Sequence, residues 1–152
     1  MTKNEAENII LPRRKYFETL LPKLTDTMRM YISDFLPNTC PACGYPTLES
    51  RNRFELCEIC FWEDDGQDNE GADAVWGGPN GDDSLTAYRI RFLNSLSAFP
   101  GNPNFLKTKK ELDILDKYIE DNEQDIAKVT AQVSVVMDCF EELRSLNLYR
   151  MG

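Results

Sequence analysis

The chain has 152 residues, 26 of them acidic and 17 basic, with no histidine, and its formal net charge at pH 7 is −9. The absence of histidine removes the commonest general base and every histidine-dependent nucleophile, which argues against triad-type hydrolases. No apolar run has membrane-spanning length, and neither the P-loop nor the dinucleotide-binding glycine pattern occurs. The sequence therefore predicts a non-enzymatic protein that does not act at a membrane.

Residues 1–37 are expected to form an N-terminal helical arm. The polar start of this arm has no apolar signal region, which favours a cytoplasmic location. A helix is expected to open at Leu11 and Pro12, and Pro22 is expected to restart it as a second helix that runs to Pro37. The apolar side chains expected in the core are Tyr16, Phe17, Leu20, Leu21, Leu24, Met28, Tyr31, Ile32 and Phe35.

Two C-x-x-C pairs, separated by thirteen residues, follow the arm. Each pair places two thiolates on one tight turn, and a hairpin between the turns brings the two edges of a tetrahedron together. With four thiolates the coordination sphere is closed, so the spacing predicts a structural rather than a catalytic Zn²⁺. The predicted metal ligands are Cys40, Cys43, Cys57 and Cys60.

The hairpin between the pairs predicts a small β zinc ribbon. Residues 45–48 and 54–56 read as two short strands, and 49–53 as the turn that connects them. Phe54 and Phe61 are expected to shield the sulfurs from water.

Three alternatives for the same cysteines stay open at this point. A pair of disulfides requires an oxidising compartment, which the polar N-terminus does not favour. A redox-active C-x-x-C is expected to open a helix after a strand, whereas a hairpin is expected here. Iron in a rubredoxin-type site uses the same four ligands, and the spacing does not separate it from zinc.

The negative charge of the chain is concentrated in residues 40–83, which carry eleven acidic and two basic side chains. Phosphate would be repelled by this segment, so direct binding of nucleic acid is not expected. A concentrated negative field instead favours encounter with a basic protein partner. Trp62 and Trp76 flank the acidic loop as expected anchors. The predicted charged face consists of Glu63, Asp64, Asp65, Asp68, Glu70 and Asp73.

Several motifs of this segment resemble the bacterial CPCC-type cysteine-rich family. They are Cys40-Pro41-Ala42-Cys43-Gly44-Tyr45, Leu56-Cys57-Glu58-Ile59-Cys60-Phe61-Trp62-Glu63-Asp64-Asp65-Gly66, Gly77-Gly78-Pro79-Asn80 and Ser84-Leu85. The resemblance covers roughly residues 38–92, but Ala42 stands where the family has the middle cysteine of its C-P-C-C motif. It implies a small cytoplasmic metal-binding domain, similar to bacterial modules sometimes found near polymorphic toxin genes, and it brings no catalytic residue.

Residues 84–152 are expected to be helical. Ser84 is a candidate N-cap for a helix that ends before the loop Phe99–Pro103. Thr108 and Glu111 form a capping box, and apolar residues then keep three-four spacing from Leu112 to Leu143. This pattern predicts either one long helix or a hairpin that bends at 121–125.

The apolar seam of the C-terminal helices needs a cover, which the N-terminal helices of the same chain or a second copy would supply. A homodimer through the C-terminal helix is therefore one expectation. Cys139 lies beside the seam and reads as an ordinary thiol.

The sequence thus predicts a mainly α fold with an inserted β zinc ribbon. Its segments are the N-terminal arm 1–37, the ribbon with its acidic loop 38–83 and the helical region 84–152. Two functions are expected from it: an immunity protein that neutralises a basic, nuclease-type toxin, or an architectural zinc-ribbon adaptor in an assembly such as the transcription or translation machinery.

Overall fold

A computed structural model describes residues 1–23 and 37–149 of the chain. The described residues contain four α-helices: α1 (Lys3–Leu20), α3 (Leu85–Ser97), α4 (Pro103–Glu120) and α5 (Ile126–Ser145). Two short 3-10 helices, Leu21–Lys23 and Gly78–Asn80, complete the regular structure. The helix predicted between Pro22 and Pro37 lies almost entirely outside the described residues.

Helix α1 begins earlier than the sequence predicted. The side chain of Thr2 caps its N-terminus by accepting a hydrogen bond of 3.2 Å from the backbone amide of Glu5, and the helix then continues through Pro12. Its buried face includes Ala6, Ile10 and Phe17, which are four and seven residues apart and therefore lie on one side of the helix. The prediction that this helix opens at Pro12 is therefore wrong.

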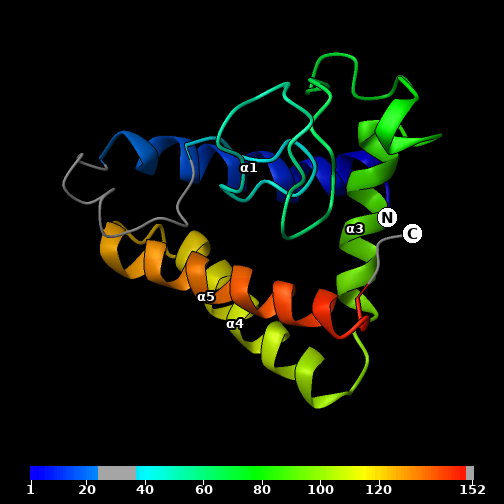
Figure 1. The fold of residues 1–152 in the computed structure, drawn as a ribbon. Helices are drawn as coiled ribbons and strands as arrows, with labels where there is room; N and C mark the ends of the chain where they lie inside the picture. The colour runs from blue at the N-terminus through cyan, green and yellow to red at the C-terminus, as the bar shows by residue number, and fades with distance from the viewer. Residues whose placement is uncertain (24–36, 150–152) are drawn as a thin grey trace.

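Helix α3 has the predicted boundaries. The hydroxyl of Ser84 accepts a hydrogen bond of 3.0 Å from the amide of Ala87, and the helix ends at Ser97, before the Phe99–Pro103 loop. In Figure 1, α3 runs crosswise to α1 and to the C-terminal helices, at one end of both.

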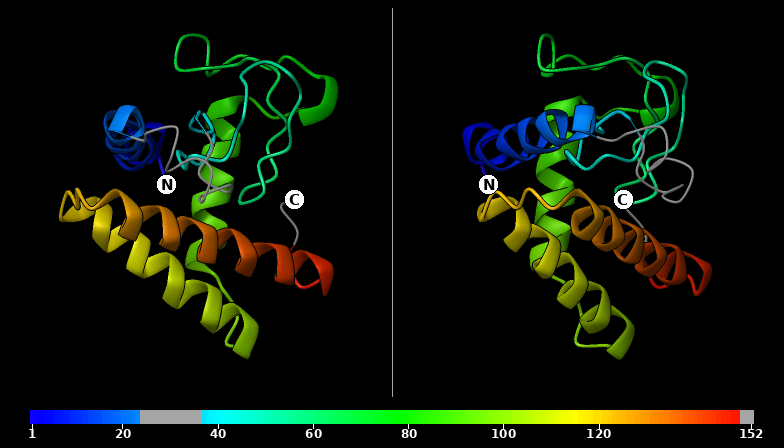
Figure 2. Two further views of the ribbon diagram at one scale, coloured as in Figure 1. Left: turned by 60° about the vertical axis from the view of Figure 1, so that its left-hand side comes forward. Right: turned by 90° about the vertical axis from the view of Figure 1, so that its left-hand side faces the viewer.

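Helices α4 and α5 form an antiparallel hairpin and lie side by side in every view (Figures 1 and 2). Asn102 caps α4, with Pro103 in its first turn, so the predicted capping box is wrong: the Thr108 hydroxyl instead donates to the carbonyl of Asn104 inside the helix, at 3.0 Å. The bend falls at 121–125, where Asn122 has a φ of +53°. Of the two predicted arrangements, the hairpin is confirmed.

The hairpin covers its own apolar seam. Leu112 and Leu115 of α4 are buried, as are the apolar residues of α5 that share the seam, Val129, Val133, Val136, Phe140 and Leu143. A second copy is not needed to cover this seam. The hydroxyl of Tyr16 donates to the carbonyl of Glu123 at 2.7 Å and ties α1 to the turn of the hairpin.

The segment of residues 37–84 has almost no regular structure. Two isolated antiparallel bridges occur in it, Asn38 with Leu48 and Leu56 with Glu63, within the described residues. The predicted strands 45–48 and 54–56 therefore do not pair with each other, and no β ribbon forms there. Figure 1 shows this segment, cyan to green, against α1 and one end of α3.

Apart from Cys139, the buried apolar residues of these elements belong to one cluster, which includes the four clustered cysteines. None of the helices in residues 1–23 and 37–149 has the length and apolar character needed to cross a membrane.

Candidate metal centre

The two cysteine pairs lie on two turns with the same hydrogen-bond pattern. In the first, the amide of Cys40 donates to the carbonyl of Tyr45, and the amide of Gly44 donates back to the carbonyl of Cys40, both at 2.8 Å. In the second, Cys57 pairs in the same way with Trp62 and Phe61, both at 2.9 Å. Each turn is therefore closed by its own backbone rather than by a shared hairpin.

The fourth residue after the first cysteine of each turn has a left-handed backbone. Gly44 has a φ of +86°, and the equivalent Phe61 has a φ of +67°. Only glycine adopts this conformation without strain. At position 44 the lack of space for a side chain also requires glycine. A Cβ there would lie 3.1 Å from Cδ of Arg13 and 3.2 Å from the carbonyl oxygen of Ile10.

The four sulfur atoms are arranged as the ligands of one metal ion. All lie within 4.8 Å of one another, with 3.7 Å between Cys40 and Cys60 and 3.6 Å between Cys43 and Cys57. A tetrahedral ion with metal–sulfur bonds of about 2.3 Å places its ligands about 3.8 Å apart. A disulfide joins sulfurs at about 2.05 Å, and all four cysteines are free. The donor set thus fits a tetrahedral metal such as Zn²⁺.

The cluster is closed to solvent, because all four cysteines are 0% exposed. Cys57 is the sulfur best prepared to be a thiolate: it accepts hydrogen bonds from the Thr47 hydroxyl at 3.0 Å and from the amide of Cys60 at 3.4 Å. Burial raises the pKa of Cys43 and Cys60, whereas at Cys57 hydrogen bonds, the one with Cys40 foremost, outweigh burial and hold the pKa well below its ordinary value. One thiolate is thus favoured before any metal binds.

Residues 38–95 match the family model described as Cysteine-rich CPCC. This part of the chain is a cysteine-rich CPCC domain. No curated protein and no solved structure gives a significant match to the chain. The matched range includes both cysteine turns and most of α3. Ala42, which replaces the middle cysteine of the motif, is fully buried, and the four-sulfur cluster is complete without a cysteine there.

The helices hold the CPCC domain through the backbone carbonyls of the two turns. Arg13 Nη1 donates to the carbonyl of Cys43 (2.7 Å), Arg89 Nε to that of Pro41 (2.8 Å) and the Tyr88 hydroxyl to that of Cys60 (2.6 Å). These three donors were not predicted as site residues. The sequence feature that could have identified them is a charged or polar residue on the inward, mainly apolar face of a helix. Arg89, for example, follows the buried Leu85 by four residues and is itself only 1% exposed.

Two carboxylates of the predicted charged face are inside the domain. Asp64 is 0% exposed and accepts a hydrogen bond of 2.8 Å from Arg51 Nε, and Asp65 is 8% exposed and accepts one of 2.9 Å from Gln67 Nε2. Asp64 and Asp65 therefore do not belong to an exposed face. They satisfy donors of their own loop, a role that is typical of aspartates in tight turns.

Asp68 joins the domain to α1. It accepts hydrogen bonds of 2.7 Å from both Arg14 and Arg51, whose guanidinium groups outweigh burial and hold the pKa of Asp68 well below its usual range. Asp73 is exposed but pairs with Lys3 at 2.7 Å. Of the predicted face, Glu70 is exposed and Glu63 half-buried, and neither forms an ion pair with a described residue.

The sequence predicted a role for each of four aromatic residues, and two of these predictions are wrong. Phe54 is 59% exposed and does not shield the cluster, and Trp76 is 56% exposed and does not anchor the loop. Trp62 is fully buried and packs edge-on against Tyr88, with ring centroids 5.0 Å apart. Phe61 is half-buried and packs against Tyr149 at 5.3 Å.

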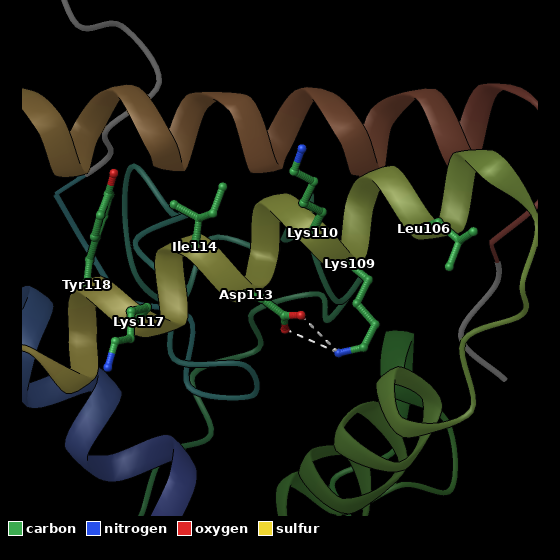
Figure 3. Close-up of a pocket in the computed structure, with 7 residues that line it drawn as sticks. All are labelled: Leu106, Lys109, Lys110, Asp113, Ile114, Lys117 and Tyr118. Atoms are coloured by element: carbon green, nitrogen blue, oxygen red, sulfur yellow. Dashed lines mark hydrogen bonds and ion pairs between the residues drawn. The ribbon is translucent and has the colours of Figure 1, made fainter.

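A groove of about 540 Å³ lies on α4, away from the cysteines. Figure 3 shows its lining residues, all from α4, with Lys109 and Asp113 in an ion pair. Leu106, Ile114 and Tyr118 supply its apolar part, and Leu106 is 55% exposed. The groove contains no cysteine, so it is separate from the metal centre.

Proposed function

We propose that this protein is a non-enzymatic, zinc-containing binding protein, in which the metal stabilises the CPCC domain and the domain surface binds a partner. The observation that carries this proposal is that four buried cysteine sulfurs all lie within 4.8 Å of one another. A closed site of four thiolates has no position for water or substrate, so its metal is structural. The domain also lacks the strands that would otherwise hold a segment of this length together.

The first test is the metal content of the purified protein. We expect one Zn²⁺ per chain by elemental analysis and its loss when any one of the four cysteines is changed to serine. The Cys139→Ser variant is the matched control, because Cys139 lies on α5, outside the cluster. A protein whose thermal stability is the same with and without Zn²⁺ would overturn this proposal.

The partner we propose is a basic protein, and the function is that of an immunity protein towards a nuclease-type toxin. Six carboxylates of residues 40–83 support this, because they are exposed or half-buried and form no ion pair with a described residue. They are Glu49, Glu55, Glu58, Glu63, Glu70 and Asp82. The exposed aromatic side chains of Phe54 and Trp76 lie in the same segment and add the apolar anchors that protein interfaces use. Such a surface would neutralise the cationic substrate site of a nuclease by charge.

A capture experiment tests this partner with a matched charge control. The metal-loaded protein is compared with the Glu58→Gln/Glu70→Gln variant and with Asp138→Asn/Glu141→Gln, which removes the same charge from α5. We expect one basic protein to be captured by the wild type and the α5 variant, to be lost from the first variant, and to have a nuclease activity that the wild type inhibits. Equal capture by all three forms would show that the acidic surface is not the binding site for the partner.

The groove on α4 favours a second candidate, an architectural adaptor that docks through the helical hairpin. Its exposed Leu106 and half-buried Ile114 and Tyr118 offer an apolar surface among lysines, which fits an acidic amphipathic segment of an assembly. The Leu106→Asp variant separates the two candidates. It should abolish capture of the partner if the protein is an adaptor and leave capture unchanged if the acidic surface binds.

A further inference from the structure

The metal centre has a charge that the protein interior must balance. Four thiolates around a divalent ion carry a net charge of −2, and all four sulfurs are 0% exposed. Burying such a charge without a counter-charge is strongly unfavourable. This inference rests on the metal binding proposed above, and it concerns which residues of the chain provide the opposite charge.

Arg89 is a buried cation whose contacts are neutral. Its side chain is 1% exposed; Nε donates to the carbonyl of Pro41 at 2.8 Å, and Nη2 donates to the side-chain oxygen of Asn69 at 2.7 Å. Among residues 1–23 and 37–149, no carboxylate oxygen lies within 4.0 Å of its guanidinium group. A buried arginine in this state lacks the ion-pair partner that such residues ordinarily have.

The other buried arginines near the cluster differ in this respect. Arg14 and the half-buried Arg51 share the carboxylate of Asp68, and Arg51 also binds Asp64. Arg14 also pairs with Glu18 at 3.8 Å, so three carboxylates satisfy these two arginines. Arg89 touches this network only through Asn69, which also accepts a hydrogen bond of 3.4 Å from Arg14. Asp68 and Glu7 attract Arg89 only at longer range, so within the described residues Arg89 has no direct ion pair.

The position of Arg89 places its charge at the metal centre. Pro41, whose carbonyl it binds, lies inside the first cysteine turn, directly after the ligand Cys40. Arg13 approaches the same turn from α1 and binds the carbonyl of Cys43, while its only ion-pair partner among the described residues, Asp116, is 3.8 Å away and 40% exposed. Two guanidinium groups thus meet the turn that supplies two of the four thiolates.

We propose that Arg89, with Arg13, is the counter-ion of a divalent metal held by the four cysteines, and that Arg89 determines how tightly the centre retains its metal. Arg89 is a positioning residue in this proposal, since it acts through charge and through the Pro41 carbonyl and does not ligate the metal. The coupling between metal binding and the charge of Arg89 is reciprocal. The metal–thiolate centre stabilises the buried cation, and the cation stabilises the centre.

The coupling predicts effects of opposite sign in the metal-bound and metal-free protein. Replacing Arg89 with neutral glutamine removes the counter-charge from the bound centre and should weaken Zn²⁺ binding about 10- to 100-fold, as is typical for residues that support metal ligands. The metal-free protein has no −2 centre for Arg89 to balance, so the same change there removes a buried cation that has no direct ion pair. Its melting temperature without metal should therefore equal or exceed that of the wild type.

The experiment measures Zn²⁺ affinity by competition with a chromophoric chelator, and thermal unfolding with and without Zn²⁺, for three variants. Arg89→Gln removes the charge, Arg89→Lys keeps it, and Arg53→Gln removes the same charge from an exposed residue between the two cysteine turns. We expect weaker binding for Arg89→Gln, affinity within about threefold of wild type for Arg89→Lys, and no change for Arg53→Gln. If Arg89→Gln does not fold, Arg13→Gln takes its place in the same comparison.

Four results would overturn the proposal. Equal Zn²⁺ affinity of Arg89→Gln and the wild type would reject Arg89 as the counter-ion while leaving the metal centre intact. Equal loss of affinity in Arg89→Lys and Arg89→Gln, or an equal fall in melting temperature with and without metal, would assign Arg89 a role in packing alone. A wild-type protein that binds no metal would instead reject the proposed function, and this inference with it.

Discussion

The CPCC domain and the α4–α5 hairpin are held together by different forces. The hairpin buries a continuous apolar seam between two regular helices of 18 and 20 residues. Between α1 and α3, the domain instead has two isolated bridges, a four-cysteine cluster and arginine side chains that bind backbone carbonyls and aspartates. Apolar packing stabilises the first region, whereas metal ligation and polar contacts are expected to stabilise the second.

This difference explains why the segment 38–84 can do without regular structure. A β-sheet satisfies backbone groups by pairing strands, but here individual carbonyls of the cysteine turns receive donors from α1 and α3. Helices with a mainly apolar inward face therefore also present three arginines, Arg13, Arg14 and Arg89, to this segment. The two regions are expected to respond differently to metal removal, to core truncation and to acid.

The largest expected effect is loss of a metal ligand. Cys57→Ser leaves three thiolates and should abolish stoichiometric Zn²⁺ binding, with a loss of stability that approaches the ~10 kcal/mol typical of small zinc peptides. Circular dichroism and elemental analysis, with Cys139→Ser as the control, measure this effect. Full retention of Zn²⁺ in Cys57→Ser would show that the four cysteines do not form one site.

The loss of stability from a core truncation in the hairpin should be smaller and should not depend on the metal. Leu115 is fully buried in the seam, so Leu115→Ala should lower the free energy of unfolding by about 2–5 kcal/mol. Chemical denaturation measures this loss, while the Zn²⁺ content should stay at the wild-type level. The exposed Leu106→Ala is the control, with little expected change. Loss of Zn²⁺ from Leu115→Ala would mean that the two regions are not separately stabilised.

The link between α1 and the CPCC domain is expected to be sensitive to acid. Asp68 is 38% exposed and paired with two arginines, so Asp68→Asn should reduce stability by about 1–3 kcal/mol at neutral pH. Because the pKa of Asp68 is lower in the folded than in the unfolded protein, its contribution is complete above an unfolded pKa of about 4 and is lost as the pH falls below it.

Urea denaturation of the wild type and of Asp68→Asn at several pH values measures the pH effect as a difference between the two proteins. That difference should shrink as the pH falls below about 4. Asp138→Asn, on the exposed side of α5, should show no difference at any pH. A difference between wild type and Asp68→Asn that is the same at all pH values would assign Asp68 a role other than its ion pairs.

The smallest expected effect is at the start of α3. Ser84→Ala removes the hydroxyl that caps the amide of Ala87 and should reduce stability by about 1 kcal/mol. Ser84→Thr keeps a capping hydroxyl and should lose less stability than Ser84→Ala. A thermal denaturation series compares the two variants, and equal losses would mean that the cap is not the cause.

Features that depend on local spacing could be predicted from the sequence. The C-x-x-C spacing identified the four clustered cysteines, and Ser84 marked the start of α3, because a turn or a cap is determined by neighbouring residues. The bend at 121–125 was one of two predicted outcomes, since an unbroken apolar period does not decide between one helix and two that pack on each other.

The polar contacts of the CPCC domain could not be predicted in this way. Asp64 is buried because Arg51 reaches it, and Asp68 is paired because α1 brings Arg14 to it from 54 residues away. A list of acidic residues reads as a charged face when these partners are unknown. The predicted ribbon failed for a similar reason: each cysteine turn has its own bridge, so the two short apolar runs between the cysteines pair with flanking residues instead of with each other.

The two tryptophans of the chain provide a built-in optical reporter. Trp62, which is fully buried and follows Cys60 by two residues, should emit at short wavelength and respond when the centre opens, whereas Trp76, 56% exposed, should emit at long wavelength throughout. A water-soluble collisional quencher should reach Trp76 and leave Trp62 unaffected. Metal loss can therefore be followed by fluorescence without any added label, with Trp76 as the internal reference.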